Sequence, residues 1–306
     1  MRTIILVFVG LLCALILPFS EGSTIGLKSN RKFRQSTNSA SNSLSVPQCG
    51  MSNVEVDRIV GGTEAVAGEF PWMTRLGYIF GFIDGEQMMS WMCGGTLISP
   101  RHILTAAHCF SEIPDFLLGY IARIGDVDCN SDNDGADPVD VFIEEIIIHD
   151  EYNDLTHEND VAVLKTDRKI SFTTKRLPAC LPPGNLKNQN LEGMETFIAG
   201  WGTTKYQGTS SDKLLKATVF ITKQKECKDA YSKDYYAVID NRTVCARNDG
   251  IDSCQGDSGG PLMLQNGNTT VVGIVSWGKG CASKNYPGVY TDVSSFLSFI
   301  KEAMTL

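Results

Sequence analysis

The stretch Gly256-Asp257-Ser258-Gly259-Gly260-Pro261 places one serine among three glycines in the last fifth of the chain. Glycines beside a serine permit a tight turn that exposes the serine hydroxyl, although such a stretch can also be no more than a turn. A serine hydroxyl is a weak nucleophile until a base takes its proton. The stretch therefore directs attention to a partner histidine, and to a carboxylate that would orient this histidine.

The chain has four histidines that could supply this base. His108 is the strongest candidate, because it ends the small-residue segment Leu104-Thr105-Ala106-Ala107 and precedes a cysteine that could anchor it. The other three lie in polar or turn-like contexts and are predicted to be ordinary surface residues: His102, His149 and His157.

Among the many carboxylates, Asp160 is distinctive because it opens the apolar run Val161-Ala162-Val163-Leu164. A charge that leads an apolar strand is expected to be partly buried and to need a hydrogen-bonded partner. Each of these signals is weak alone.

The pattern from residue 59 onward is β. Short apolar runs recur between clusters of Gly, Pro, Asn and Asp, without long helical periods between them, which predicts antiparallel barrels or sandwiches. The runs include Gly95–Ile98, Ile143–Ile148, Val161–Leu164, Thr196–Ala199, Val219–Ile221 and Val271–Val275.

The C-terminus is the exception to this β pattern. Ser294 or Ser295 is the predicted cap of a helix there. One face of that helix gathers apolar residues, namely Phe296, Leu297, Phe299, Ile300, Ala303 and Met304.

Composition sets broad limits on the class of protein. The 306 residues are 42% hydrophobic and 20% charged, which is typical of one large or two ordinary globular domains. The formal net charge of −8 argues against a nucleic-acid partner.

The first 22 residues are predicted to be a signal peptide. Arg2 precedes an apolar run from Ile4 to Leu17 that is short for a membrane span, and the small residues Ser20 and Gly22 suit a cleavage site. A membrane anchor is the alternative interpretation. Residues 23–58, rich in Ser, Asn, Lys and Arg, form a basic leader ahead of an acidic body. This contrast is consistent with a propeptide, and we expect a secreted product without a membrane partner.

Cysteine usage agrees with export. Of the ten cysteines, Cys13 lies in the signal segment, which leaves nine and therefore at least one that is unpaired or bonded to another chain. No C-x₂-C pair indicates a zinc site. Asn241 and Asn268 head N-x-T sequons and are predicted glycosylation sites on an exported chain.

Four motifs occur here in the order and spacing of the chymotrypsin-like (S1) serine proteases: Ile59-Val60-Gly61-Gly62, Thr105–Cys109, Asn159–Leu164 and Gly256–Pro261. The chain resembles the trypsin-type members of this family over roughly residues 49–306. Its Gly278–Cys281 and Tyr286–Thr291 segments are similar to those of arthropod venom and haemolymph proteases. The resemblance implies an all-β fold of two antiparallel six-stranded β-barrels with a C-terminal helix, and a catalytic site between the barrels.

The resemblance also assigns roles to single residues. It makes Ser258 the nucleophile, His108 the general base and Asp160 the group that orients it, with the backbone N–H groups of Gly256 and Ser258 as the oxyanion hole. It makes Asp252 the base of the S1 pocket, which would select Arg or Lys at the P1 position of the substrate. The resemblance also places Ser253 in that pocket as a further hydrogen-bond donor and acceptor. It makes Gly278 and Gly288 the walls of the pocket.

Activation and disulfide pairing are implied in the same way. Cleavage after Arg58 would separate a propeptide or light chain, residues 23–58, from the protease domain, residues 59–306. It would also free the Ile59 ammonium to pair with Asp257. The implied disulfides are Cys49–Cys180, Cys93–Cys109, Cys227–Cys245 and Cys254–Cys281, which leave Cys129 either free or bonded to another chain.

Residues 126–140 form an acidic loop. Asn130, Asp132, Asp134 and Gly135 mimic the start of an EF-hand, but Val141 stands where that motif needs a glutamate. A calcium site at Asp126–Asp140, of the kind found in some family members, is compatible with the sequence, as is a solvated surface. No cofactor is required. Because Pro287 stands where sodium-activated relatives carry an aromatic residue, no sodium dependence is expected.

The main alternative to an endopeptidase is a non-catalytic homologue that acts as a binding cofactor, although such proteins usually lose a triad residue. A clip-domain protease is excluded because residues 23–58 contain only Cys49. The expected partners are protein substrates with Arg or Lys at P1, an activating trypsin-like protease, and serpin or Kunitz-type inhibitors. The pathway stays open among clotting, immunity, venom and digestion.

Overall fold

The computed structural model describes residues 49–54, 62–84, 86–111, 117–131, 133–203, 208–248, 256–280, 283 and 285–306. The chain divides into two units, 1–44 and 45–306, and every described residue belongs to the second. The predicted signal peptide and most of the predicted leader lie outside these residues. No helix in the described ranges is long and apolar enough to cross a membrane.

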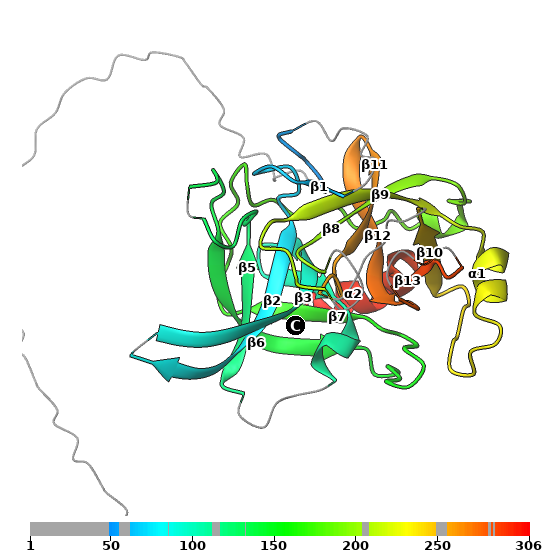
Figure 1. Cartoon of the computed structure of the whole chain (residues 1–306), viewed down its shortest axis with the longest axis horizontal. Helices are drawn as coiled ribbons and strands as arrows, with labels where there is room; N and C mark the ends of the chain where they lie inside the picture. The colour runs from blue at the N-terminus through cyan, green and yellow to red at the C-terminus, as the bar shows by residue number, and fades with distance from the viewer. Residues whose placement is uncertain are drawn as a thin grey trace, which may run out of the picture. The chain divides into compact units, whose positions relative to one another are not determined.

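The first half of the described chain forms a closed antiparallel barrel (Figure 1). Its strand order is β2-β3-β4-β7-β6-β5. The strands are β2 (Met73–Ile83), β3 (Glu86–Ser99), β4 (His102–Thr105), β5 (Gly119–Ile124), β6 (Val139–Ile148) and β7 (Ala162–Thr166).

The second half forms a sheet with the strand order β9-β10-β13-β12-β11-β8, and pairing of β8 with β9 closes this sheet into a ring. This bears out the predicted pair of six-stranded barrels. The short strand β1 (Thr63–Glu64) pairs with β9 outside the ring. The strands are β8 (Glu195–Gly200), β9 (Leu215–Ile221), β10 (Thr243–Arg247), β11 (Pro261–Asn266), β12 (Asn268–Trp277) and β13 (Gly288–Asp292).

The apolar runs of the sequence fill the barrel interiors. Leu97, Ile103 and Leu164 are fully buried in the first barrel, and Leu262 and Tyr290 in the second. Burial of such a side chain is worth roughly 1.5–3 kcal/mol. These runs therefore fix the register that sets the loops at the barrel ends.

Helical structure is short and lies outside the barrels. It comprises η1 (Ala107–Phe110), η2 (Leu186–Asn188), α1 (Gln224–Ala230), η3 (Val293–Phe296) and α2 (Leu297–Ala303). The predicted C-terminal helix exists, but its predicted cap was wrong. Asp292 caps the preceding η3 turn by accepting the N–H of Ser294, because its carboxylate outcompetes the hydroxyls of Ser294 and Ser295, which donate to it.

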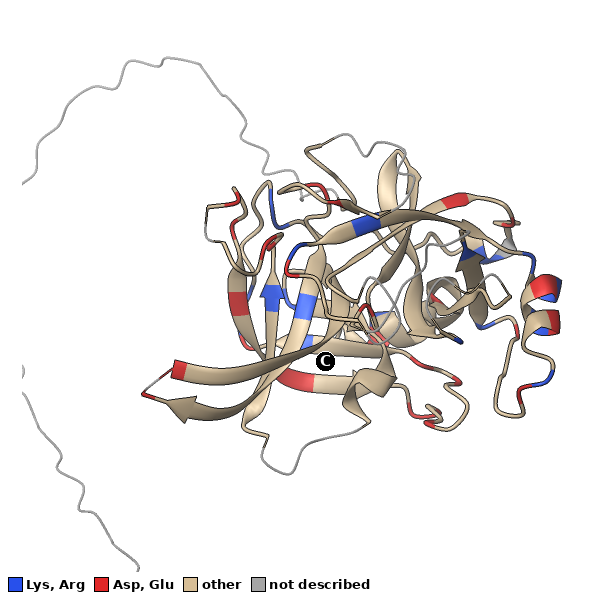
Figure 2. Ribbon diagram, viewed as in Figure 1, with Lys and Arg blue, Asp and Glu red and all other residues tan. Residues whose placement is uncertain are grey.

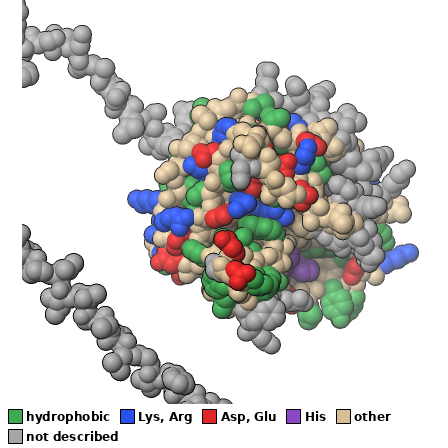
Figure 3. All heavy atoms as spheres, turned by 60° about the vertical axis from the view of Figure 1, so that its left-hand side comes forward, with side chains coloured by type: hydrophobic (Ala, Val, Ile, Leu, Met, Phe, Trp, Pro, Cys, Tyr) green, Lys and Arg blue, Asp and Glu red, His purple; other side chains and the backbone are tan. Residues whose placement is uncertain are grey.

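The β2–β3 hairpin extends well beyond its barrel (Figure 1). Its end combines exposed apolar and acidic residues: Phe82 and Ile83 are 60% and 58% exposed beside Asp84 and Glu86. In Figure 2 the ribbon at this tip is red, the colour of Asp and Glu. On the face drawn in Figure 3, acidic and basic side chains are interspersed with apolar ones, so the negative charge is not gathered there into one patch.

Candidate active site

Asp160 and His108 form the centre of the candidate site. Asp160 is fully buried, and its Oδ1 accepts the backbone N–H of His108 at 2.9 Å. Its Oδ2 lies 2.8 Å from His108 Nδ1. Because the carboxylate holds both the backbone and the ring of His108, it fixes the imidazole with Nδ1 towards Asp160 and leaves Nε2 as the working nitrogen.

The buried carboxylate of Asp160 stays ionised. Burial alone would raise its pKa, but the hydrogen bond and the charge of His108, together with the Ser276 hydroxyl bond to Oδ2, outweigh burial and lower the pKa below its ordinary value. A charged Asp160 stabilises a proton on the neighbouring imidazole. That is the property a histidine base needs.

Both barrels hold this pair in place. His108 lies in η1 directly after β4, where the Cys93–Cys109 disulfide ties it to β3. Asp160 comes just before β7, and its carbonyl oxygen accepts the Thr291 hydroxyl of β13 at 2.8 Å. The contacts from Thr291 and Ser276 belong to the second barrel, so the position of Asp160 depends on how the barrels pack.

Ser258 lies in the turn that leads into β11. Its carbonyl oxygen accepts the N–H of Gly94 at 2.7 Å, and Cys109 Sγ lies 3.8 Å from the same oxygen. The turn therefore lies against the segment that carries His108. Three residues predicted from separate parts of the sequence, His108, Asp160 and Ser258, come together at one place.

Gly259 permits this close approach. Its φ is +78°, and a Cβ at this position would overlap Thr105 Oγ1 and come within 2.6 Å of the Gly94 carbonyl oxygen. Only glycine adopts such a backbone without strain and without a clash. The glycine-rich stretch Gly256–Pro261 is therefore one of the points at which the two barrels meet.

Asp257 occupies a niche beside the turn. Its Oδ1 accepts the N–H of Gly202 at 2.8 Å, and a Cβ on Gly202 would lie 2.5–2.6 Å from its carboxylate. Gly256, the preceding residue, has a φ of +96°, and a Cβ there would lie 3.0 Å from Gly202 Cα. The predicted activation partners of Asp257, Arg58 and Ile59, lie outside the described residues.

Two of the predicted S1 residues lie face to face. A Cβ on Gly278 would lie 3.9 Å from Gly288 Cα, so the two glycines border the same space. Gly278 is exposed and Gly288 is buried. The other predicted members of this pocket, Asp252 and Ser253, fall outside the described ranges.

Comparison with known proteins agrees with this geometry. The family model described as Trypsin matches residues 59–300. The chain belongs to the trypsin family. It is 43% identical to "Venom serine protease Bi-VSP" of Bombus ignitus, over 85% of this chain and 72% of that protein. It is 42% identical to "Venom protease" of Bombus pensylvanicus, over 80% and 99% respectively, and 38% identical to "Proclotting enzyme" of Tachypleus tridentatus, over 84% and 68%.

This trypsin-family protein is therefore a serine endopeptidase, of a family that needs no cofactor, and its relatives include proteins named as venom and clotting proteases.

His157 is a neighbour of His108 and Asp160 that the sequence interpretation missed. Its ring packs edge-on against His108, with centroids 5.7 Å apart and an interplanar angle of 80°. The prediction that it is an ordinary surface residue was wrong. No local sequence pattern signalled this contact, because it depends on how the loop before Asp160 folds back towards His108.

The described cysteines pair as the resemblance implied. The disulfides are Cys49–Cys180, Cys93–Cys109 and Cys227–Cys245, and Cys129 is a free thiol. Cys254 and Cys281 lie outside the described residues.

The acidic loop 126–140 was the predicted calcium candidate, and several of its carboxylates lie against arginine side chains. Arg123 binds both oxygens of Asp140 at 2.8 Å, and Arg176 lies 3.0 Å from Asp137. The buried Asp126 Oδ2 makes no hydrogen bond among the described residues, but Arg123 Nη1 lies 3.6 Å from it. Guanidinium groups thus pair with three carboxylates of this loop, whereas Asp134 Oδ2 accepts the backbone N–H of Asp128. Asp132 lies outside the described residues.

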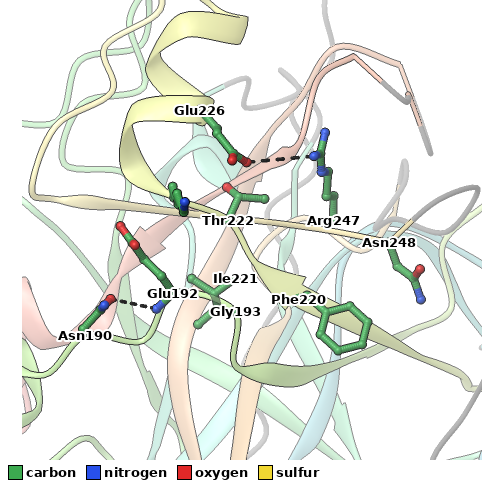
Figure 4. Close-up of a pocket in the computed structure, with 10 residues that line it drawn as sticks. Asn190, Glu192, Gly193, Phe220, Ile221, Thr222, Glu226, Arg247 and Asn248 are labelled. Atoms are coloured by element: carbon green, nitrogen blue, oxygen red, sulfur yellow. Dashed lines mark hydrogen bonds and ion pairs between the residues drawn. The ribbon is translucent and has the colours of Figure 1, made fainter.

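A separate pocket of about 490 Å³ lies on the second barrel, between the segment 190–193, β9 and α1 (Figure 4). Its walls combine Phe220, Lys223 and a 3.9 Å ion pair of Arg247 with Glu226. None of the predicted catalytic residues lines it. The candidate active site therefore rests on the geometry of the triad and not on this pocket.

Proposed function

We propose that the protein is a secreted zymogen, activated by cleavage after Arg58, that hydrolyses peptide bonds after Arg or Lys through His108, Asp160 and Ser258. One observation carries the proposal: the buried Asp160 holds His108 by two hydrogen bonds, beside a serine turn locked to the same segment.

In the proposed reaction, Ser258 attacks the scissile carbonyl carbon while His108 takes the proton from its hydroxyl group. Asp160 stabilises the imidazolium that forms, and His108 then gives the proton to the leaving amine. The backbone N–H groups of Gly256 and Ser258 would bind the oxyanion. The loss of one such donor typically costs about 3–4 kcal/mol of transition-state stabilisation.

We infer selectivity for basic residues from Asp252. A carboxylate at the base of a closed pocket selects a cation, because a cationic side chain otherwise loses its hydration without gaining a partner. Gly278 and Gly288, which face each other, leave room for a long side chain. Ser253 would add a hydrogen bond to a lysine substrate.

We also infer the mode of activation. Cleavage after Arg58 by a trypsin-like protease would free the Ile59 ammonium to pair with Asp257. The niche formed by Gly202 supports this role, because it holds the Asp257 carboxylate next to both proposed oxyanion-hole residues.

Secretion and partners follow as parts of the same proposal. The predicted signal peptide, the disulfides and the exposed sequon residues Asn241 and Asn268 suit an extracellular glycoprotein. Relatives named for venom, clotting and melanization point to protein substrates of such cascades. Serpin or Kunitz-type inhibitors would be the natural regulators.

The experiment uses the full chain treated with a trypsin-like protease that is then removed. Hydrolysis of a small arginine ester is expected after treatment, and a matched ester of an uncharged residue should be cleaved far more slowly. Ser258→Ala should lose activity by at least 10³-fold, and Arg58→Gln should remain an inactive precursor. A non-catalytic homologue would give no hydrolysis in any form, and full activity of Arg58→Gln would exclude the proposed activation step.

Calcium is not expected to stabilise the enzyme, because Arg123 and Arg176 already form ion pairs with Asp126, Asp137 and Asp140 of loop 126–140. A ligand present at 100 times its dissociation constant would add about 2.7 kcal/mol to the stability of the folded state. Thermal unfolding should therefore show the same midpoint in calcium and in EGTA. A rise of several degrees in calcium would show that the loop binds the ion.

A further inference from the structure

His157 and the catalytic pair form a cluster of metal-ligating groups. One ligand atom from each of His108, His157 and Asp160 lies within 4.8 Å of the other two. Two imidazoles and a carboxylate are ligands that zinc accepts. Ligand atoms on one zinc ion lie at most about 4 Å apart, so a shift of roughly 1 Å would bring the three groups onto a common ion.

His157 has an unused nitrogen for this purpose. Its Nδ1 is buried and makes no hydrogen bond to any described residue. A buried polar atom without a partner costs free energy that a bound ion would recover. The ring is half-buried, and the side chain of His108 is 18% exposed, so the pair can be reached from solvent.

The loop that carries His157 is held in place before any ion arrives. The N–H of Asn153 donates to the Glu158 carbonyl oxygen at 3.0 Å, and Arg242 binds the Glu158 side chain at 2.6 Å and Asn159 Oδ1 at 3.0 Å. Metal sites gain affinity when outer partners orient their ligands in this way. The charges that act on His157, apart from the neighbouring imidazole, are the carboxylates of Asp154 and Asp160, which favour a cation.

We propose that a divalent transition-metal ion of the zinc class binds His108 and His157, with Asp160 as third ligand or as hydrogen-bonded support, and reversibly blocks the protease. The bound ion occupies a lone pair of His108, so the imidazole cannot take the proton of Ser258. The inference rests on the proposed role of His108 as the general base.

Zinc chloride titration of the activated full chain tests the block. Hydrolysis of the arginine ester should fall along a saturable curve and recover with EDTA. His157→Gln should raise the zinc inhibition constant at least tenfold, with each enzyme compared with its own zinc-free rate. His149→Gln, a change to a histidine that packs on Phe296 and Phe299 away from the triad, is the matched control and should leave the inhibition constant unchanged.

Direct binding separates the metal site from the catalytic proposal. Calorimetry on the inactive Ser258→Ala chain should show one zinc ion per molecule, and Ser258→Ala combined with His157→Gln should lose this binding. The proposed site would be overturned if His157→Gln had the same zinc inhibition constant as the wild-type enzyme. It would also be overturned if the Ser258→Ala chain bound no zinc. If the chain proved inactive after cleavage, the function would fail, while calorimetry would still decide whether the site exists.

Discussion

Cys129 lies close to Arg75, and the charges of Arg75 and Arg123 both act on its thiol. Arg75 Nη1 donates to its Sγ, and the guanidinium groups of Arg75 and Arg123 lie 5.0 and 5.7 Å from the Trp91 ring. Burial raises the pKa of the thiol, and the positive charges of the two arginines offset this only in part. The nucleophilic thiolate is therefore scarce at neutral pH.

We expect Cys129 to react slowly with a disulfide reagent such as DTNB in the native enzyme, and at the ordinary rate after unfolding. One thiol per molecule should be counted in denaturant, and Cys129→Ser should abolish the signal. A mixed disulfide with another chain would instead give no free thiol and a higher mass on a non-reducing gel.

The proposed triad residues were chosen from local contexts that are weak singly and from the order and spacing of the family motifs that contain them. His108 follows small residues, Asp160 leads an apolar strand, and Ser258 stands among glycines. The contacts of His157 and Ser276 could not be predicted in this way. They depend on the packing of loops and barrels distant in the sequence, which no local pattern records.

The segment just before β7 carries backbone strain at the active site. His157 and Asn159 have φ angles of +53° and +55°, in the left-handed region that non-glycine residues rarely adopt. Arg242, the residue before β10, holds this segment through Glu158 and Asn159 and is itself held by Asp240. The resulting Arg242 clamp joins the second barrel to the loop that ends at Asp160.

Removal of the clamp should destabilise the enzyme in a pH-dependent way. Hydrogen bonds from Arg242 lower the pKa of Glu158. For Asp240, burial alone would raise the pKa, but the hydrogen bonds from Arg242 outweigh burial and lower it. Because both pKa values are depressed on folding, the stabilisation is present above the ordinary carboxyl pKa and is lost as the pH falls through the folded values.

Arg242→Gln should therefore cost about 1 kcal/mol near pH 7, as half-exposed ion pairs do. The difference from wild type in urea unfolding should shrink towards zero in strong acid. Lys225→Gln, which breaks only an exposed pair with Asp229, is the control and should have little effect at any pH. A pH-independent loss in Arg242→Gln would show that packing, and not charge, accounts for the effect.

At the level of strands, the apolar runs located the buried parts of β3, β7, β8, β9 and β12, whereas the run Ile143–Ile148 of β6 is half-buried or exposed and the buried residue of that strand is Val141. The projecting end of the β2–β3 hairpin could not be predicted in the same way. Exposed Phe82 and Ile83 share that end with acidic residues, so burial does not impose a simple alternation there. The Asp292 cap was missed for a different reason, because serine and aspartate compete for the same role in adjacent positions.

The whole molecule depends on the contact of the two barrels at Gly259. Gly259→Ala combines a positive φ with a clash against Thr105, whereas Gly267→Ala has nearly the same φ of +77° and nothing within 4 Å of its Cβ. The strained backbone alone should cost roughly 1–2 kcal/mol, and overpacking typically adds about 1–3 kcal/mol. The comparison of the two variants isolates the clash.

Thermal unfolding should therefore show a clearly larger loss for Gly259→Ala than for Gly267→Ala, and ester hydrolysis should fall only in Gly259→Ala. Equal losses of thermal stability in both variants would show that the structure accommodates the added methyl group at Gly259 without a clash.

The Cys49–Cys180 disulfide ties the segment ahead of the protease domain to its body. Gly50 reinforces the tie, since its N–H donates to Pro178 and its carbonyl oxygen accepts the N–H of Thr269. After cleavage at Arg58 we expect one band on a non-reducing gel and two on a reducing gel. Cys49→Ser should give two bands under both conditions, and an unreduced wild-type enzyme that runs as two bands would contradict the tie.

The disulfide also has a practical consequence for anyone who handles the protein. An affinity tag placed ahead of Cys49 would survive maturation and would capture the working enzyme as well as its precursor. The same disulfide would also keep any binding activity of that segment attached to the mature protease, so that the segment could bring the enzyme to its substrate.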